Sequence, residues 1–434
     1  MNNESPIYDA RSLGVPKMLI LGLQHTFAMF GATVLVPLIT GLNISTTLLM
    51  AGLGTLLFHL ITKGKVPAFL GSSFAFLGGF AAVAQTPDGT PIPEMLPYAC
   101  GGIVIAGLIY LVVAALVGAF GVKKIMRFFP PVVTGPIIIS IGLILAPSAI
   151  SNCQTNWPLA IVAFGVIVIA NIFGRGMVKI IPILLGILVS YAVALLTHQI
   201  DFTSVTNPEI PLLAMAPITP AKFDISAILT IAPIALASMM EHIGDISAIS
   251  ATVGKNFIKD PGLHRTLLGD GLATSLAGMF GGPANTTYGE NTGVLALTRV
   301  YDPRVIRIAA VCAIVLSFIP KFAAVVNTIP TAIIGGVSFI LYGMISAIGA
   351  RNLVEGRVDL SLSRNLIIAA TILVSALGFH SIGGITFFIA GTKINLSGLA
   401  IASLLGILLN ALLPGNVYEF DTEVPDKTGV NFKV

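Results

Sequence analysis

The stretch that decides the fold is Pro283-Ala-Asn-Thr-Thr-Tyr-Gly-Glu290-Asn-Thr-Gly-Val-Leu-Ala-Leu-Thr-Arg299, together with Glu241-His-Ile-Gly-Asp245 upstream of it. Both segments place carboxylates in long apolar surroundings, and no lysine or arginine stands beside these acids. An ionised carboxylate at the centre of a helix in a bilayer costs roughly 2.5–3.5 kcal/mol on insertion scales. Unpaired acids at this depth therefore indicate a binding or coupling function.

The composition around these acids is that of a membrane protein. Of the 434 residues, 55% are hydrophobic and 10% are charged, whereas soluble domains have about 25% charged residues. The apolar composition implies contact with membrane lipid. The net charge of +4 comes from basic residues scattered singly between apolar runs, which argues against a nucleic-acid partner. Cys100, Cys153 and Cys312 have no CxxC spacing, so we expect no zinc site, disulfide framework or cofactor.

Apolar runs of about 20 residues, the length that crosses a bilayer, recur along the whole chain. We predict an all-α polytopic protein with fourteen spans, at residues 17–38, 46–62, 66–84, 97–121, 128–149, 156–173, 177–197, 226–249, 266–281, 284–298, 305–325, 328–349, 365–380 and 394–413. With these spans, all but three of the 23 basic residues fall on one side of the membrane, and the exceptions are Lys222, Lys321 and Lys393. Because basic loops stay in the cytoplasm, both termini are expected there.

A proline-rich segment divides these spans into two sets of seven. The chain then has five parts, namely a cytoplasmic tail (1–16), a first repeat (17–205), an extracellular or periplasmic linker (206–225), a second repeat (226–413) and a second cytoplasmic tail (414–434). A set of seven spans repeated in tandem must insert its second copy upside down. This inverted repeat is the plan of secondary transporters.

The third span of each set is short and interrupted by small and hydroxyl residues. Span 3 contains Gly71-Ser-Ser-Phe74, and span 10 contains Asn285-Thr-Thr-Tyr-Gly-Glu290. Non-helical backbone survives in a bilayer only where protein or a cavity surrounds it. We therefore expect short extended segments in spans 3 and 10, leading into half-helices whose free N–H groups face a ligand near the middle of the membrane.

Four acids lie within predicted spans: Glu241, Asp245, Asp270 and Glu290. Acids without neighbouring cations suit a protein that binds protons, metal cations or a ligand rich in N–H donors. Glu241 and Asp245 share a helical face, so one can hold substrate while the other relays charge. Each acid could instead bond a hydroxyl or amide in a structural role. We prefer that interpretation for Asp270, which we expect to pair with Arg265 near the cytoplasmic face.

Four other side chains at membrane depth are ambiguous when taken alone. His25, beside Gln24, is more typical of a core histidine bonded to a neighbouring helix. His242 adjoins Glu241 but points about 100° away around the helix, which favours packing or a supporting bond. Phe74 and Tyr342 are typical of an apolar core.

As a set, these motifs resemble the nucleobase–ascorbate transporter family of nucleobase:cation symporters. The run Glu290-Asn291-x-Gly293-x-x-x-x-Thr298-Arg299 matches its signature, and Gln24-His25 and Gly71-Ser-Ser-Phe-Ala-Phe76 fit the same family. The fuller run Asn285-Thr-Thr-Tyr-Gly-Glu-Asn291 looks like its bacterial uracil permease branch rather than the xanthine or urate branches. The resemblance runs from residue 12 to residue 413.

The resemblance implies a fold and a way of working. Its fourteen spans form seven-plus-seven inverted repeats, in which a core domain of spans 1–4 and 8–11 moves against a gate domain of spans 5–7 and 12–14. The expected mechanism is an elevator-type alternating-access movement. The expected setting is a homodimer in the bacterial cytoplasmic membrane.

The resemblance also implies a substrate site. Glu241 and Glu290 would hold the pyrimidine, while backbone amides at Phe74 and Gly289 would meet its carbonyl oxygens. The residues expected around the ring are Phe74, Tyr288, Tyr342 and Ser73. Uracil presents two N–H donors and two carbonyl acceptors, so carboxylates and half-helix amides are its complement. An aromatic face can stack on its ring.

One position departs from the family pattern. Some uracil permeases have a histidine one turn after the first glutamate, where this chain has Asp245. We expect proton symport, with Asp245, Glu241 and His25 as the coupling groups and without a bound metal. Sodium stays open as the coupling ion, because Asp245, hydroxyls and carbonyls would form an all-oxygen site.

Three alternatives remain at this stage. Within the family, the substrate could be xanthine or another purine or pyrimidine base. An intramembrane metalloenzyme using Glu241, His242 and Asp245 lacks the HExxH pattern, in which two histidines share a helical face. An anion transporter or channel of the same inverted architecture would prefer a basic or neutral lining. We therefore expect a uracil transporter rather than an enzyme.

Overall fold

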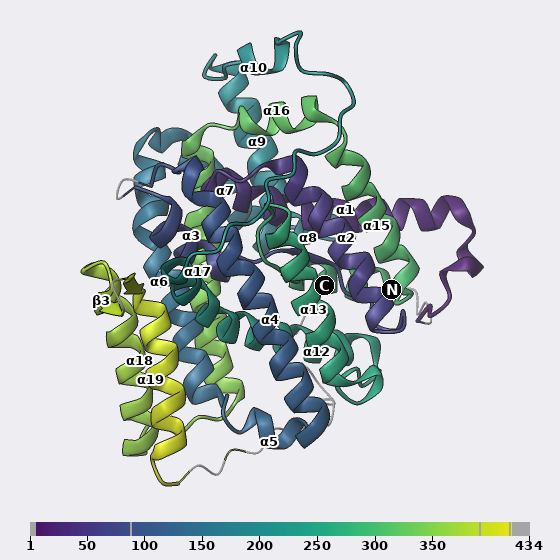
Figure 1. Cartoon of the computed structure of the whole chain (residues 1–434). Coiled ribbons are helices and arrows are strands. Elements are labelled where there is room, and N and C mark those ends of the chain that lie inside the picture. Colours follow the sequence, from purple (N-terminus) through teal and green to yellow (C-terminus); the bar gives the residue numbers. More distant parts are fainter. Residues whose placement is uncertain (1–5, 87–88, 390–391, 416–417, 419–434) are drawn as a thin grey trace.

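The computed structural model describes residues 6–86, 89–389, 392–415 and 418, and it is built almost entirely of helices (Figure 1). The first five residues of the predicted N-terminal tail lie outside the described residues, as does nearly all of the predicted C-terminal tail. In Figure 1 the chain runs from the purple helices near the N-terminus to the yellow-green and yellow helices α18 and α19.

The elements up to the proline-rich segment are η1 (Ala10–Leu13), α1 (Val15–Thr40), α2 (Ile44–Ile61), β1 (Leu70–Ser72), η2 (Phe74–Phe76), α3 (Leu77–Ala84), η3 (Pro93–Met95), α4 (Leu96–Phe120), α5 (Val122–Met126), α6 (Pro131–Gln154), α7 (Trp157–Phe173), α8 (Met177–Ile180) and α9 (Pro182–Leu196). The remaining elements are α10 (Thr203–Thr206), α11 (Ile225–Ile231), η4 (Ala232–Ile234), α12 (Ala235–Val253), η5 (Ile258–Gly262), α13 (Leu263–Met279), β2 (Asn285–Thr287), α14 (Gly289–Thr298), α15 (Pro303–Ser317), α16 (Pro320–Asn327), α17 (Thr331–Glu355), α18 (Ser363–Ser381), β3 (Ile385–Ile389), β4 (Thr392–Leu396) and α19 (Gly398–Leu412).

The apolar runs of the sequence coincide with these elements. Each predicted span overlaps a helix or a strand that leads into a helix. In the described part of the chain, seven helices are long and apolar enough to cross a membrane, or eight if one bent pair counts as a single span. The protein is therefore a multi-pass membrane protein, while the count of fourteen and the inverted repeat stay predictions.

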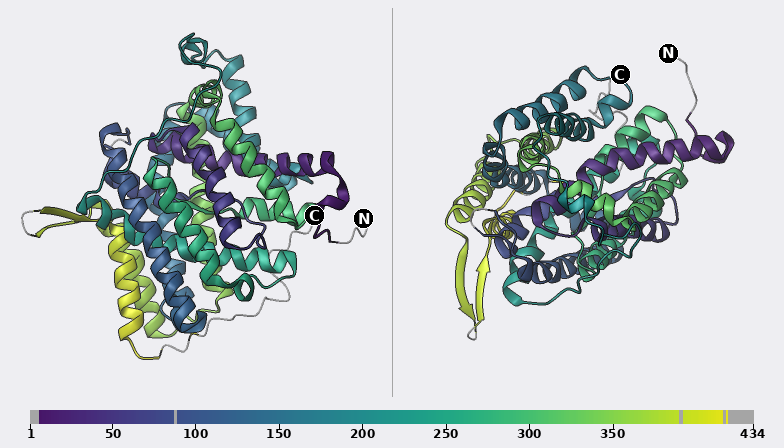
Figure 2. Two further views of the ribbon diagram at one scale, coloured as in Figure 1. Left: turned by 45° about the vertical axis from the view of Figure 1, so that its right-hand side comes forward. Right: turned by 90° about the horizontal axis from the view of Figure 1, so that it is seen from above.

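Two segments differ from what the apolar runs predict. The span predicted at 305–325 is not one continuous helix, because α15 and α16 are bent by 86° relative to each other. Pro320 opens α16, and a proline cannot donate the hydrogen bond that would continue α15. The span predicted at 394–413 begins inside the antiparallel hairpin of β3 and β4, which projects from the side of the molecule (Figure 2).

The extended segments predicted in spans 3 and 10 are present and pair with each other. Strands β1 and β2 are antiparallel, with Leu70 opposite Thr287 and Ser72 opposite Asn285. Both strands are completely buried. The pairing satisfies backbone groups that a bilayer could not, and it joins two segments that lie in different halves of the sequence.

The most extensive helix contacts fall within two groups. We call the set of α1, α2, α4 and α11–α15 the first helical group, and the set of α6, α7, α9 and α17–α19 the second helical group. In the first group α13 packs on α4 and α2, and α15 packs on α2 and α1. In the second group α17 packs on α6 and α7, and α18 packs on α19 and α6. The strand pair and the half-helices after it belong with the first group.

Reciprocal glycine contacts bring the central helices of each group close together. A Cβ atom on Gly107 of α4 would lie 2.5 Å from the Gly271 carbonyl oxygen, and one on Gly271 would lie 2.8 Å from the Gly107 oxygen. In the second group, a Cβ atom on Gly349 of α17 would lie 2.7 Å from the carbonyl oxygen of Gly135 in α6. Small residues at such crossings let helices pack backbone to backbone, as is common in membranes.

Candidate functional site

The acids of α12 lie against the start of α14. The Thr287 hydroxyl donates to Asp245 Oδ2 at 2.9 Å, and a Cβ atom on Gly289 would lie 3.7 Å from Asp245 Oδ1. Glu290 follows in the first turn of α14. Glu241 lies one turn before Asp245 on the same face of α12, the helix that packs against α14. The structure thus brings together the three carboxylates that the sequence singled out.

These three acidic residues are only partly covered by the rest of the protein. They are half-buried, and the neighbouring glycines, Gly244 and Gly289, are exposed. A Cβ atom on Gly244 would meet no atom within 4 Å. Within the described residues none of the three acids forms an ion pair with a lysine or arginine. Apart from the Asp245 Oδ2 that accepts from Thr287, their oxygens therefore remain available to a ligand.

Two helix starts supply the matching donors. Strand β1 leads through Ser73 into the helical segment Phe74–Ala84, and β2 leads through Tyr288 into α14. Ser73 and Tyr288 are both extended, and neither side chain caps the helix that follows it. The first N–H groups of a helix have no acceptor inside the helix. The amides at Phe74 and Gly289 can therefore donate to carbonyl oxygens of a ligand.

Tyr288 forms a fixed aromatic wall beside the strand pair. Its hydroxyl donates to the Ser72 carbonyl oxygen at 3.0 Å and lies 3.3 Å from the Thr33 hydroxyl of α1. Its ring lies against Gly71, where a Cβ atom would approach it to 2.5 Å. Glycine at position 71 is therefore required for the ring to occupy this place.

The other ring-binding candidates occupy different positions. Phe74 is buried at the start of its helix. The Ser73 hydroxyl lies 3.3 Å from the Ser238 hydroxyl, which ties this helix to α12. Tyr342 is buried on α17, in the second helical group, whereas the other predicted ligands belong with the first group. Tyr342 therefore reaches a substrate only from the opposite helical group.

His25 contacts α14 rather than the acids of α12. The Asn291 side-chain nitrogen lies 3.1 Å from His25 Nδ1 and 3.1 Å from the His25 carbonyl oxygen. His25 is buried, so these contacts join α1 to α14 one residue after Glu290. This is the inter-helix bond that a core histidine makes, and a coupling role for His25 stays a prediction.

The predicted pair of Asp270 and Arg265 is wrong. The Arg265 guanidinium donates to the Ile61 carbonyl oxygen at 3.1 Å, and Asp270 Oδ2 lies 3.2 Å from His242 Nδ1 instead. Asp270 and His242 are both completely buried. Five residues rotate a helix by about 140°, so the side chains of Arg265 and Asp270 point to different sides.

Thr287 joins the two acidic positions into one polar chain. Its hydroxyl lies 3.4 Å from His242 Nδ1 in addition to its bond to Asp245. The sequence singled out Asp245 and assigned His242 a supporting bond, but it missed Thr287 and the part played by Asp270. A hydroxyl in an interrupted span and a further acid at membrane depth were the available signals.

The chain matches a known family and relatives along most of its length. Residues 16–382 match the family described as the Permease family. The sequence is 42% identical over 415 residues to the uracil permease of Bacillus caldolyticus, covering 92% of this chain and 93% of that protein. It is 40% identical over 413 residues to the uracil permease of Bacillus subtilis, covering 90% and 91%. It is 39% identical over 436 residues to that of Escherichia coli K12, covering 94% and 96%.

Solved structures share the fold at low sequence identity. The transmembrane domain of the cyanobacterial bicarbonate transporter BicA aligns with a TM-score of 0.59 at 14% identity, covering 94% of this chain and 99% of that one. The structure of SLC26A9 aligns with a TM-score of 0.65 at 12% identity, covering 93% and 66%. The likeness to these solved structures shows the fold alone. The three relatives reported above are permeases and not enzymes. The chain therefore belongs to the permease family, the nucleobase–ascorbate transporters that its motifs resemble.

Proposed function

We propose that the protein imports uracil across the cytoplasmic membrane by symport with protons. The observation that carries this proposal is the convergence of Glu241, Asp245 and Glu290 on the start of α14, beside the β1–β2 pair. The relatives that are about two-fifths identical and cover nearly the whole chain are uracil permeases, which supports the choice of base.

The arrangement complements the edges and faces of a pyrimidine. Glu241 and Glu290 accept hydrogen bonds from the two ring N–H groups, while the amides at Phe74 and Gly289 donate to the two carbonyl oxygens. The Tyr288 and Phe74 rings offer flat apolar surfaces to the base. A base that lacks this order of donors and acceptors leaves a half-buried carboxylate unpaired, at a cost of about 1–3 kcal/mol or more.

Charge balance favours a coupling cation. Three carboxylates gathered where α12 meets α14, without a lysine or arginine, repel each other in a medium of low polarity. A proton shared by Glu241 and Asp245 removes part of this repulsion and prepares Glu241 for substrate. Thr287 holds Asp245 in place for this exchange. Sodium is the other candidate ion, because Asp245 and Thr287 together present the oxygen ligands that hard cations prefer.

The two helical groups suggest how the site moves. All proposed ligands except Tyr342 belong with the first helical group, so this group can carry base and proton together past the second group. We propose fourteen spans in two inverted repeats of 17–205 and 226–413, an elevator-type movement and a homodimer. Both termini would then lie in the cytoplasm, as the basic loops predict.

Uptake into proteoliposomes tests this function. Purified protein is reconstituted, and radiolabelled uracil uptake is measured under an imposed proton gradient, an imposed sodium gradient, or neither. We expect accumulation with the proton gradient and its loss on adding an uncoupler. Unlabelled uracil should compete, while xanthine, urate, thymine and cytosine compete less. Accumulation driven by sodium alone would overturn the proton assignment, and stronger competition by xanthine would overturn the choice of base.

A further inference from the structure

A cavity lies apart from the strand pair, where the N-terminal segment meets three loops. Its volume is about 620 Å³. The loops follow α2, α12 and α14, and the basic residues of all three predict the cytoplasmic side. A volume of this size is typical of small-molecule sites, which span about 300–1,000 Å³. None of the proposed uracil ligands lines this cavity.

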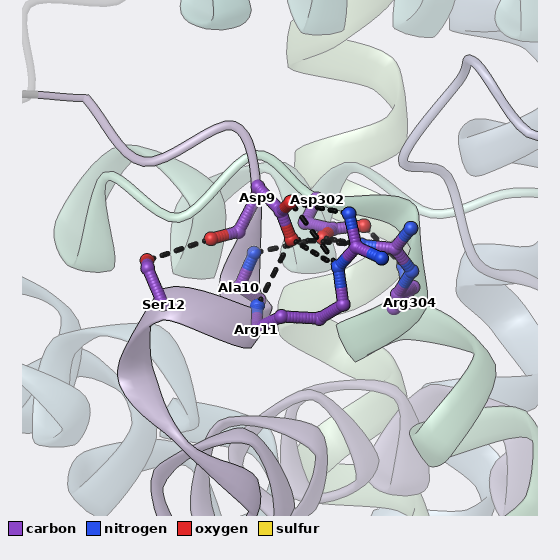
Figure 3. A network of polar contacts seen from close by, with 6 residues as sticks. All are labelled: Asp9, Ala10, Arg11, Ser12, Asp302 and Arg304. Carbon is purple, nitrogen blue, oxygen red and sulfur yellow. Dashed lines mark hydrogen bonds and ion pairs between the residues drawn. The ribbon is translucent and has the colours of Figure 1, made fainter.

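The N-terminal segment forms one wall of the cavity, and the polar contacts drawn in Figure 3 hold it in place. Asp9 pairs with Arg11 at 2.7 Å and with Arg304 at 2.9 Å, while the Ala10 N–H donates to Asp302 Oδ2 at 2.8 Å. The Arg11 guanidinium beside Asp9 holds the pKa of that carboxyl well below its usual range, so the ion pairs persist at neutral pH. Since Tyr8 precedes Asp9, its position is fixed by the same contacts.

Two tyrosines form the aromatic part of the cavity. The rings of Tyr8 and Tyr301 lie 5.6 Å apart between centroids, at 55° to each other. The Tyr8 hydroxyl donates to the Val253 carbonyl oxygen at 2.8 Å. Lys255 Nζ lies 4.4 Å from the centre of the Tyr8 ring. An aromatic surface with a cation on it suits a ligand that is both planar and anionic.

Two of the cations that line the cavity have no carboxylate partner in the described residues. Lys65 pairs with Asp260 at 2.6 Å, and Arg304 is satisfied by its two aspartates. Lys255 and Arg307 have no such ion pair within the described part of the chain. The Arg307 Nε atom is buried there without a hydrogen-bond acceptor. A buried donor without an acceptor is unfavourable, and an incoming anion would satisfy it.

We propose that this cavity binds a phosphorylated nucleoside, with the phosphate on Arg307 and Lys255 and the base against Tyr8 and Tyr301. A guanidinium presents its donors in a fork that matches phosphate oxygens, and a lysine adds a second charge. The aromatic rings provide the surface that a base requires and that inorganic phosphate does not use. A bound nucleotide would connect the N-terminal segment to the loops after α2, α12 and α14, and thereby report the intracellular nucleotide level to the carrier.

Equilibrium binding of radiolabelled uridine 5′-monophosphate to the full-length purified protein tests this site. We expect saturable binding, and unlabelled nucleotide should compete for it. Inorganic phosphate, ribose 5-phosphate and uridine should each compete at least about tenfold more weakly than the nucleotide. Arg307→Gln and Lys255→Gln should each weaken binding about tenfold or more, since each removes a charge-assisted bond. Tyr8→Leu removes one aromatic ring of the cavity and should also weaken nucleotide binding.

Matched controls separate this site from the uracil site. Lys321→Gln removes a cation on α16, outside the cavity lining, and should leave nucleotide binding unchanged. Glu290→Gln should weaken uracil binding but not nucleotide binding, so the two proposals can fail independently. Absence of nucleotide binding at millimolar concentration would overturn the proposal. Equal displacement by inorganic phosphate, or displacement only by vesicles containing phosphatidic acid, would overturn it as well, because a simple anion or a lipid headgroup would then be the ligand.

Discussion

Thr287 connects two acids whose surroundings differ. Asp245 is half-buried beside the exposed Gly289, whereas Asp270 is completely enclosed and contacts His242. A group that exchanges protons with a substrate site needs access to it, and Asp245 has that access. Asp270 has none, so its contact with His242 serves to hold α13 against α12. The two acids should therefore respond differently to substitution.

Glu290→Gln should weaken uracil binding without unfolding the protein. The substitution keeps the shape of the side chain but removes the charge that accepts a ring N–H. Hydrogen bonds to charged groups contribute about 1.5–3 kcal/mol, which corresponds to a loss of roughly 10- to 150-fold in affinity. Isothermal titration calorimetry with uracil measures this loss of affinity. Glu355→Gln, at an exposed position near the end of α17 beside Arg351, is the control. Unchanged affinity in Glu290→Gln would contradict the assigned role.

Asp245→Asn should separate transport from the proton gradient. An amide cannot exchange a proton, but it still accepts the hydrogen bond from Thr287. We expect uracil affinity to change by no more than about tenfold, as for one neutral hydrogen bond. Counterflow exchange of uracil should persist in vesicles, while gradient-driven accumulation disappears. Uracil-dependent proton uptake that survives in these vesicles would remove Asp245 from the coupling mechanism.

Asp270→Ala should destabilise the protein more than Asp270→Asn does. Alanine removes the buried oxygen that lies 3.2 Å from His242 Nδ1, at a cost of about 1–3 kcal/mol in free energy of unfolding, whereas asparagine keeps an oxygen there. Denaturation of the purified protein in detergent, followed by tryptophan fluorescence of Trp157, compares the two variants. Equal loss of stability in both would contradict a stabilising contact between the Asp270 side chain and His242.

At the residue scale, the sequence predicted the acids but not all of their partners. Unpaired carboxylates in apolar runs are expensive, so Glu241, Asp245 and Glu290 could be recognised from composition alone. The partner of Asp270 could not, because the contact with His242 depends on how α12 and α13 pack. Arg265 is the nearer cation in the sequence, but the rotation of the helix separates it from Asp270.

Among the elements, the β1–β2 pair determines where the site lies. It places the starts of two half-helices side by side, although they come from different halves of the chain. The small residue at position 71 permits the contact between the pair and the Tyr288 ring. The geometry of the site thus depends on a residue that contributes no side chain to it.

Gly71→Ala should displace the Tyr288 ring. The added Cβ atom would lie 2.5 Å from that ring, which is too close for contact. Overpacking of this kind costs about 1–3 kcal/mol, so both thermal stability and uracil affinity should fall. Gly78→Ala is the matched control, since its Cβ atom would meet only Ile144 at an ordinary 3.9 Å. Melting temperature and uracil titration measure both effects, and equal behaviour of the two variants would contradict the argument.

Hydrophobic runs predicted the positions of the elements but not every change of direction. Runs of about 20 apolar residues locate helices well because length and composition alone decide membrane insertion. The bend at Pro320 and the β3–β4 hairpin escaped this reasoning. Short apolar runs such as Ile385–Ile389 are compatible with either a strand or a helix, and the partner strand decides between them. The interruptions at Gly71 and Gly289 were predictable, because small and hydroxyl residues stand out in an apolar span.

For the whole molecule, topology is the property that the two repeats predict most directly. A variant without Cys100, Cys153 and Cys312 receives a single cysteine, either as Asn207→Cys in the linker or as Lys123→Cys in α5. An impermeant maleimide should label the linker position in intact cells and the α5 position only after permeabilisation. The reason is that basic residues accompany α5 but are sparse in the linker. Labelling of both positions from outside would contradict seven spans in the first repeat.

The attachment of the N-terminal segment has a practical consequence. Ile7 exchanges backbone hydrogen bonds with Arg299 and Tyr301, directly after the half-helix that carries Glu290. A fluorophore fused ahead of Ile7 would consequently move with α14 and the first helical group rather than independently of them. Paired with a second dye at the start of α18, it would turn each transport cycle into a change in energy transfer, so that single carriers could be followed in real time.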